Sequence, residues 1–171
     1  MPQSEILIRE PVLGDAPHLI ELWVDRKYDS EPGYRAFSDR RIEEVRGNIS
    51  YAENWIRGAL EQPEEFLNVA TIGSAVVGFC RAQAPPNAEY CAWDGITVSR
   101  QHQGTGVAGY LEDARMEWSR QFGRPLIQVK IVPGNVRSER FFQKRGFKKV
   151  GEQAPSADLP LRFNIFQLEL A

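Results

Sequence analysis

Two glycines at the junction of a predicted strand and a predicted helix are the residues best suited to do chemistry. An apolar stretch at 93–98 leads into Gln103-Gly104-Thr105-Gly106, and a helical pattern begins directly afterwards. Glycines at such a junction allow the backbone to approach a ligand closely. The first turn of the helix offers unpaired N–H groups and the positive end of the helix dipole. The loop is therefore predicted to bind an anion, and phosphate is the usual one.

Periodicity predicts the elements that hold this loop in place. Apolar residues recur at helical spacing from Val107 to Phe122, and Gly123 with Pro125 would end that helix. At 126–132 branched apolar residues alternate with polar ones, which is typical of a strand. The unit is therefore a strand, a glycine loop, a helix and a second strand.

The loop differs from two well-known phosphate motifs. It is not a P-loop, because no Lys-Ser/Thr pair follows the second glycine. The dinucleotide pattern G-x-G-x-x-G is matched in spacing by Gly109, so the spacing alone leaves that alternative open. Against it, the acidic residue expected about 20 residues later is absent from 126–132. Too few elements follow for a doubly wound fold.

A second motif lies at 135–147, and the two motifs together resemble the GCN5-related N-acetyltransferase family. Residues 101–106 read Gln-His-Gln-Gly-Thr-Gly and match the family's pyrophosphate pattern Gln/Arg-x-x-Gly-x-Gly/Ala. Residues 135–147 match its late segment Asn-x-x-Ala-x-x-Phe-Tyr-x-Lys-x-Gly-Phe at most positions. Ser138 stands where the family usually has Ala, and Phe142 stands where it usually has Tyr.

The resemblance implies a site for acetyl-CoA as co-substrate. Strand residues Ile96, Thr97 and Val98 would pair their backbones with the pantetheine arm, Asn135 would contact that arm, and Lys144 would lie near the 3′-phosphate. Phe142 takes the place of the Tyr that usually protonates the departing thiolate, and it counts among the cofactor-binding residues. Backbone N–H groups facing the pyrophosphate would come from Gln103, Gly104, Thr105, Gly106, Val107, Ala108 and Gly109.

Acetyl transfer to an amine needs a base, because a typical amine is protonated near neutral pH. The candidate is Asp94, which lies in an otherwise apolar stretch where burial would raise the pKa of its carboxyl. Alternatively, Asp94 caps a bulge formed with Gly95 or faces solvent. His102 is read as a ring packed beside the cofactor entrance rather than as a base. Ser138, one helical turn before Phe142, is the candidate proton donor to the thiolate.

The remaining pattern predicts an α/β fold. Its mixed, mostly antiparallel sheet of six to seven strands would be flanked by about four helices, in one domain over 1–171. The resemblance adds that the fourth and fifth strands splay apart to admit the cofactor. A polar, turn-rich segment is predicted at 28–40. Strands are predicted at 5–9, 66–72, 75–83, 89–98, 126–132, 147–151 and 163–170. Helices are predicted from 14–17 onward, at 41–60 with a break near Gly47, at 107–122 and at 138–145.

The composition limits the classes of partner that the chain is expected to bind. The net charge of −2 gives no general attraction to nucleic acid or to an anionic membrane. No apolar run is long enough for a membrane helix, no Cys/His cluster has metal spacing, and the N-terminus does not read as a signal peptide, so a cytoplasmic location is expected. Basic residues crowd 137–149, where they would suit the phosphates of coenzyme A.

The leading prediction is an acetyl-CoA-dependent N-acetyltransferase that acts on a primary amine of a small molecule or peptide. The alternative is a catalytically silent acyl-CoA-binding protein or sensor, which Phe142 favours. A nucleic-acid-binding module built on 137–149 is a weaker third reading. The acceptor cannot be read from the sequence, and a homodimer is common in the fold that the resemblance implies.

Overall fold

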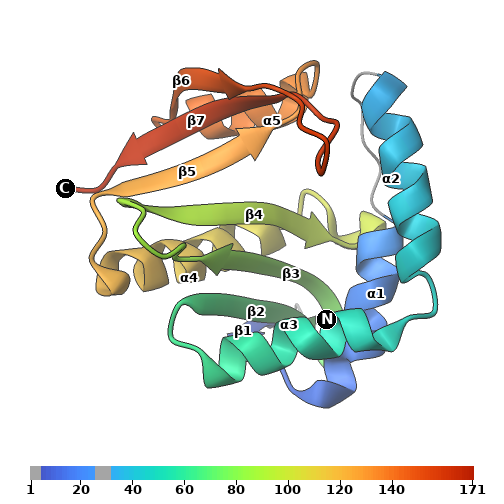
Figure 1. Ribbon diagram of the computed structural model, residues 1–171. Coiled ribbons are helices and arrows are strands. Elements are labelled where there is room, and N and C mark those ends of the chain that lie inside the picture. The colour runs from blue at the N-terminus through green and yellow to red at the C-terminus, as the bar shows by residue number, and fades with distance from the viewer. Residues whose placement is uncertain (1–4, 26–31) are drawn as a thin grey trace.

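The computed structural model describes residues 5–25 and 32–171, and for residues 32–38 it describes the backbone only. Within this part of the chain, seven strands form one sheet in the order β1-β2-β3-β4-β5-β7-β6 (Figure 1). β4 and β5 are parallel, and the other neighbouring strands are antiparallel. The predicted fold class is confirmed. The strands are β1 (Ile6–Arg9), β2 (Glu65–Ile72), β3 (Ala75–Gln83), β4 (Tyr90–Val98), β5 (Leu126–Ile131), β6 (Lys148–Gln153) and β7 (Phe163–Glu169).

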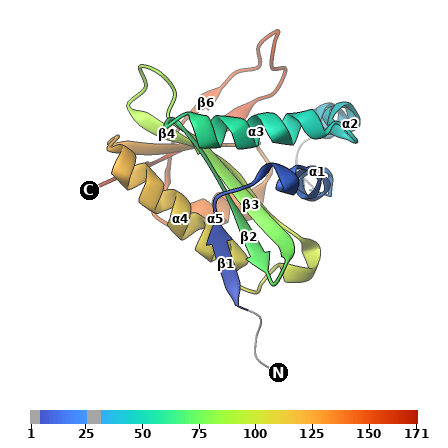
Figure 2. The same cartoon turned by 90° about the horizontal axis from the view of Figure 1, so that it is seen from below.

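Helices cover both faces of the sheet. The helices of the described residues are α1 (Ala16–Val24), α2 (Pro32–Val45), α3 (Ile49–Glu61), α4 (Val107–Phe122) and α5 (Val136–Gln143). α1 and α3 lie on one face, and α4 lies on the other (Figure 2). α2 lies next to α1. The sheet is therefore the middle layer of three.

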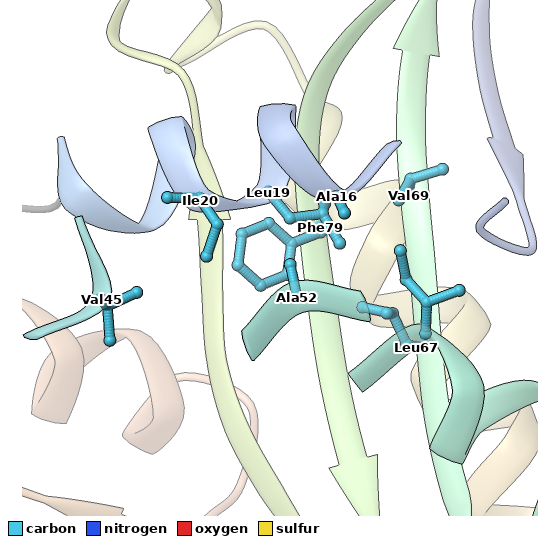
Figure 3. Packing of buried hydrophobic residues seen from close by; sticks show 9 residues of the cluster. Ala16, Leu19, Ile20, Val45, Ala52, Leu67, Val69 and Phe79 are labelled. Atoms are coloured by element: carbon cyan, nitrogen blue, oxygen red, sulfur yellow. The ribbon is translucent and has the colours of Figure 1, made fainter. Parts of the chain in front are cut away.

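Successive side chains of β3 point to opposite faces of the sheet and pack into two separate cores. Phe79 packs against α1 and α3 in a cluster that includes Leu19 (Figure 3). The next residue, Cys80, packs on the opposite face with Leu111 of α4. Successive strand side chains point to opposite faces. Arg81 therefore shares the α1/α3 face with Phe79.

β4 and β5 separate part-way along their length. Their pairing ends at Trp93↔Val129, although β4 continues to Val98. β4 stays paired with β3 up to Val98, and β5 stays paired with β7 up to Ile131. The backbone of 94–98 therefore has no partner strand on the β5 side among the described residues. This is the splay that was expected between the fourth and fifth strands.

The second helix starts earlier than predicted. Pro32 and Gly33 predict a turn-rich segment at 28–40, yet α2 begins at Pro32. Proline suits the first helical position, because its missing N–H needs no partner there. The break near Gly47 is confirmed, since this residue has a φ of +73° and separates α2 from α3. Residues 26–31 lie outside the described part.

Asp15 ties the turn before α1 to the first strand. Its carboxylate accepts two hydrogen bonds from the Arg9 guanidinium, at 2.8 and 2.9 Å, and one from the Val12 N–H at 2.8 Å. Burial acts to raise the pKa of Asp15, but the bonds from Arg9 and Val12 outweigh it, so the pKa is lowered. A carboxyl with a lowered pKa stabilises the folded state above its ordinary value of about 3.9, and this stabilisation disappears as the pH falls through the folded pKa.

Asp15→Asn is therefore expected to reduce the free energy of unfolding by roughly 1–3 kcal/mol at neutral pH, because the amide carries no charge and has one acceptor oxygen in place of two for Arg9 and the Val12 N–H. Urea unfolding at several pH values measures this. The difference from the native protein should shrink as the pH falls below about 3.9, where the native carboxyl also becomes protonated. A difference that stays constant across that range would contradict the assignment. The exposed Asp113→Asn serves as the control.

Candidate active site

A β-bulge interrupts β4 where it leaves β5. One residue of β3, Arg81, faces two residues of β4, Asp94 and Gly95. A bulge bends its strand and redirects side chains, and bulges are common beside active sites. The bulge that the alternative placed at Asp94 and Gly95 is therefore present, and no described residue donates a hydrogen bond by which the Asp94 carboxylate would cap it. The register pairs on either side are Cys80↔Ile96 and Ala82↔Trp93.

The Asp94 carboxylate lies in a more polar setting than its sequence neighbours suggest. Those neighbours predict burial, but the side chain is 44% exposed, so that expectation is wrong. The reason is alternation, because Trp93 and Ile96 point toward the helix layer of α4 while Asp94 points to the other face. Its nearest charged partner is Arg81, whose Nη1 lies 3.7 Å from Oδ2. This separation is too long for a hydrogen bond.

Arg115 of α4 holds the bulge from the opposite face of the sheet. The residue is fully buried, and Nη1 donates hydrogen bonds to the carbonyl oxygens of Arg81, at 3.3 Å, and of Asp94. The guanidinium also lies over the Trp93 ring, with Cζ 4.1 Å from the centroid. Burial lowers the pKa of Arg115 from its ordinary value. The two strands are thereby joined at the bulge, where their regular pairing is interrupted.

This contact fixes the direction of the peptide between Asp94 and Gly95. The C=O and N–H of a trans peptide point in opposite directions. Because the Asp94 carbonyl accepts from Arg115, we expect the Gly95 N–H to point away from Arg115, and Gly95 itself lines a cleft. An N–H held in this way is suited to bind an oxygen atom that lies there.

The cleft occupies about 470 Å³ on the α1/α3 face, a volume within the range of small-molecule sites. Its walls come from both sides of the splay between β4 and β5. Its lining includes the aromatic residues Trp23, Trp55, Phe79, Tyr90 and Phe163 and the charged residues Arg81, Asp94 and Lys130.

The predicted glycine loop ends at an uncapped helix. Gly104 and Gly106 have φ values of +78° and +93°, which side chains of other residues rarely allow. Gly106 is the N-cap of α4, and no side chain caps the helix. Residues 107–109 have no intrahelical partner for their N–H groups, and the first N–H to bond back is that of Tyr110, to the Gly106 carbonyl. The helix predicted at 107–122 is confirmed, and its N-terminal end has no side-chain cap.

Part of this loop is hydrogen-bonded within itself. The Thr105 hydroxyl donates to the His102 carbonyl, so its proton is already engaged. The N–H groups of Gln103 and Thr105 make long bonds of 3.4 Å to carbonyls of the preceding turn. The His102 ring lies 2.6 Å from the Ser99 hydroxyl through Nδ1. Within the described loop, the open N–H groups are thus those of the glycines and the start of α4.

Residues Ile96, Thr97 and Val98 lie beyond the point where β4 leaves β5. Thr97 lines the cleft, whereas the other two side chains pack toward Leu111 of α4. The carbonyl of Val98 accepts a hydrogen bond of 3.3 Å from the Gln103 side chain. This segment therefore offers its backbone to the open side of the splay, with one carbonyl already partnered.

α5 carries the remaining predicted residues. The Asn135 Oδ1 accepts a bond of 3.3 Å from the Ser138 N–H, and this cap starts the helix two residues before its predicted position. Ser138 and Phe142 lie one turn apart on one face, and the Phe142 ring stands edge-on to Phe147, 5.1 Å between centroids. Lys144 is exposed at the end of the helix. The Asn135 oxygen thus has a local structural role.

Among the site residues that were missed from the sequence, Arg81 and Arg115 surround the bulge. Arg115 follows Leu111 by four positions on the apolar face of its helix, and a charge at such a position was a usable signal. Arg81 lies in a strand of ordinary alternation, and only the register with β4 brings it to Asp94.

No group of three or more His, Cys, Asp or Glu side chains is placed to hold a metal ion in the described residues. Among the same residues, no helix has both the length and the apolar character needed to cross a bilayer.

Solved structures with this fold are numerous, and the similarity extends over nearly the whole chain. The PaiA N-acetyltransferase of Thermoplasma acidophilum, solved with coenzyme A, is 17% identical with a TM-score of 0.74, covering 97% of this chain and 99% of its own. The ribosomal-protein-alanine N-acetyltransferase of Brucella melitensis is 18% identical with a TM-score of 0.73, covering 96% and 99%. A spermidine N-acetyltransferase chimera from Vibrio cholerae and hSSAT is 14% identical with a TM-score of 0.70, covering 97% and 96%. At these identities the similarity shows the fold.

The family is shown by the sequence itself. No curated protein sequence matches significantly. The sequence model described as the Acetyltransferase (GNAT) family matches residues 27–147, a range that contains the bulged strand, the glycine loop and α5. The chain therefore belongs to the GNAT acetyltransferase family.

Proposed function

We propose that residues 1–171 form a single domain that transfers an acetyl group from acetyl-CoA to a primary amine, by direct attack while both substrates are bound. The observation that carries this proposal is the bulge at Asp94 and Gly95. There an inward-facing N–H, a carboxylate and the start of the splay lie within two residues of one strand. The uncapped end of α4 follows the same strand.

The residues present fit acetyl-CoA. Positions 104 and 106 have left-handed backbones, and a Cβ built on Gly104 would meet no heavy atom within 4 Å, so the loop leaves room for a pyrophosphate. The open N–H groups of 107–109 would bind its oxygens. The exposed Lys144 would add a cation near the 3′-phosphate. When bound, acetyl-CoA supplies a thioester whose acetyl carbon is the electrophile.

Each remaining task falls to a group of this chain. The Gly95 N–H would bind the thioester oxygen and stabilise the charge that develops there, a contribution of about 3–4 kcal/mol for one such donor. Asp94 would accept the proton that the amine loses as the C–N bond forms. Ser138 would pass a proton to the sulfur as the C–S bond breaks and regain one from water, because Phe142 has no hydroxyl to do so.

Asp94→Asn is expected to reduce kcat/KM about 100-fold at pH values below the pKa of the amine, because the proton on nitrogen then has no acceptor. Initial rates across a pH series measure this, with coenzyme A affinity expected to stay unchanged. Asp113→Asn, an exposed substitution on α4, is the matched control. An unchanged pH–rate profile would exclude Asp94 as the base.

The alternative is a protein that binds acyl-CoA without turnover, which the Phe at 142 favours. Release of coenzyme A in the presence of a panel of amines distinguishes the two. The chain's own thiols should not disturb such an assay, since Cys80 and Cys91 are buried and burial raises the pKa of Cys80 to about 11. Tight binding of acetyl-CoA with no amine-dependent thiol release would support the alternative.

A further inference from the structure

The charges of the cleft differ from those that a polyamine acceptor would need. Of the charged side chains that line it in the described residues, two are cations, Arg81 and Lys130, and one is an anion, Asp94. A polycation requires several carboxylates, since each ammonium group that loses water needs a partner. The spermidine N-acetyltransferase named above acts on a substrate of that class. This cleft instead favours an acceptor that carries an anion as well as an amine.

Arg81 is a positioned guanidinium with unused donors. It is held over the Trp55 ring, with Cζ 4.8 Å from the centroid, and its side chain is only 24% exposed. Its single charge contact in the described residues is the loose one with Asp94, and none of the described side chains or carbonyls accepts a hydrogen bond from its guanidinium. A guanidinium whose N–H groups are unused can donate two parallel hydrogen bonds to one carboxylate.

The spacing of Arg81 and Asp94 suits one particular class of molecule. With Nη1 and Oδ2 3.7 Å apart, a carboxylate on Arg81 and an amine on Asp94 would be close neighbours. An α-amino acid carries these two groups on a single carbon. Lys130, exposed on β5 at the far side of the splay, adds a second positive charge to the same cleft.

The residues that line the cleft indicate what kind of side chain the acceptor carries. Trp23 and Trp55 come from α1 and α3, Phe79 and Tyr90 come from the sheet, and Phe163 comes from the start of β7. Aromatic walls on several sides favour a flat apolar body, because offset and edge-on ring contacts add to the area that is buried.

We infer that the acceptor is a free α-amino acid with an aromatic side chain, whose carboxylate binds Arg81 and whose amine is presented to Asp94. This inference rests on the proposed acetyl transfer. The amine nitrogen bonds to the acetyl carbonyl carbon as the C–S bond breaks, and its proton passes to Asp94 and from there to water. The sulfur takes a proton from Ser138, whose hydroxyl regains one from water. The products are an N-acetyl amino acid and coenzyme A.

The test compares acceptors that differ in one group, with release of coenzyme A as the readout. L-tryptophan should exceed tryptamine, which lacks the carboxylate, at least 100-fold in kcat/KM. It should exceed L-alanine, which lacks the ring, by a similar factor, and spermidine should be the poorest of the four. A preference for spermidine or tryptamine would overturn the inference while leaving acetyl transfer intact. No thiol release with any amine would instead contradict the proposed function.

Variants of the two cations make the test specific. Arg81→Met should lower kcat/KM for L-tryptophan about 100-fold, with little change for tryptamine and none in coenzyme A affinity. The exposed Lys130→Gln, which does not perturb the interior, should raise KM for L-tryptophan several-fold. Arg57→Met is the matched control, because this arginine lies on α3 and does not line the cleft. Equal losses with both acceptors in Arg81→Met would show a structural role and overturn the inference.

Discussion

Gly104→Val should weaken coenzyme A binding about 100-fold, a loss of about 2.7 kcal/mol, while the protein stays folded. Position 104 has a φ of +78°, where a β-branched residue is strained by about 1–3 kcal/mol. A Cβ there meets no heavy atom of the protein within 4 Å, so the valine methyl groups would occupy open space at the loop that is proposed to bind the pyrophosphate. Titration calorimetry with coenzyme A measures the affinity directly.

The other end of the same helix provides the control. Gly123 has a φ of +84°, and a Cβ there also meets nothing within 4 Å, but the residue is the C-cap of α4. Gly123→Val should therefore lower thermal stability by a similar amount and leave coenzyme A affinity within about twofold of the native value. If both variants lose affinity equally, the loop is not the phosphate site and the effect comes from the helix as a whole.

Arg115→Met should lower kcat about 100- to 1,000-fold with coenzyme A affinity nearly unchanged, because the Gly95 N–H would lose its fixed direction. The guanidinium donates to the carbonyls of Arg81 and Asp94, and methionine can donate to neither. Two of its nitrogens, Nε and Nη2, are buried without a hydrogen-bond partner. The substitution also leaves the carbonyls of Arg81 and Asp94 without this donor, so it should reduce the free energy of unfolding by about 1–3 kcal/mol.

Two measurements separate this role from a general one in folding. At a temperature where circular dichroism shows Arg115→Met to be fully folded, kcat should still be reduced, and the exposed Arg120→Met on the same helix should change neither stability nor kcat. A variant with a native kcat would show that the bulge does not need the arginine to hold its peptide. The Gly95 N–H would then lose its proposed role.

The glycine loop and the helix after it could be predicted because their signals are local. Positive φ at Gly104 and Gly106 and an apolar repeat from Val107 onward depend on neighbours in the chain, and the structure places the helix at 107–122 as expected. The order of strands and helices follows in the same way, and only α2 begins where a proline and a glycine suggest a turn.

The acceptor side of the site depends on the register between strands. No single segment of the sequence indicates that register. The bulge brings Arg81 of β3 beside Asp94 of β4, and α4 brings Arg115 beneath both. The apolar neighbours of Asp94 suggested burial, but in the sheet they point to the opposite face. Such partners are far apart in sequence, so periodicity alone could not place them.

The proposed transfer of an acetyl group from acetyl-CoA to an amine can be followed directly. Acetyl-CoA labelled with carbon-13 in its acetyl group tests it, with mass spectrometry of the amine after reaction with the native protein and with Gly104→Val. We expect labelled acetyl on the amine nitrogen in an amount equal to the free coenzyme A that is released, and much less of both with the variant. Binding of acetyl-CoA by the native protein with no label on any amine would contradict it.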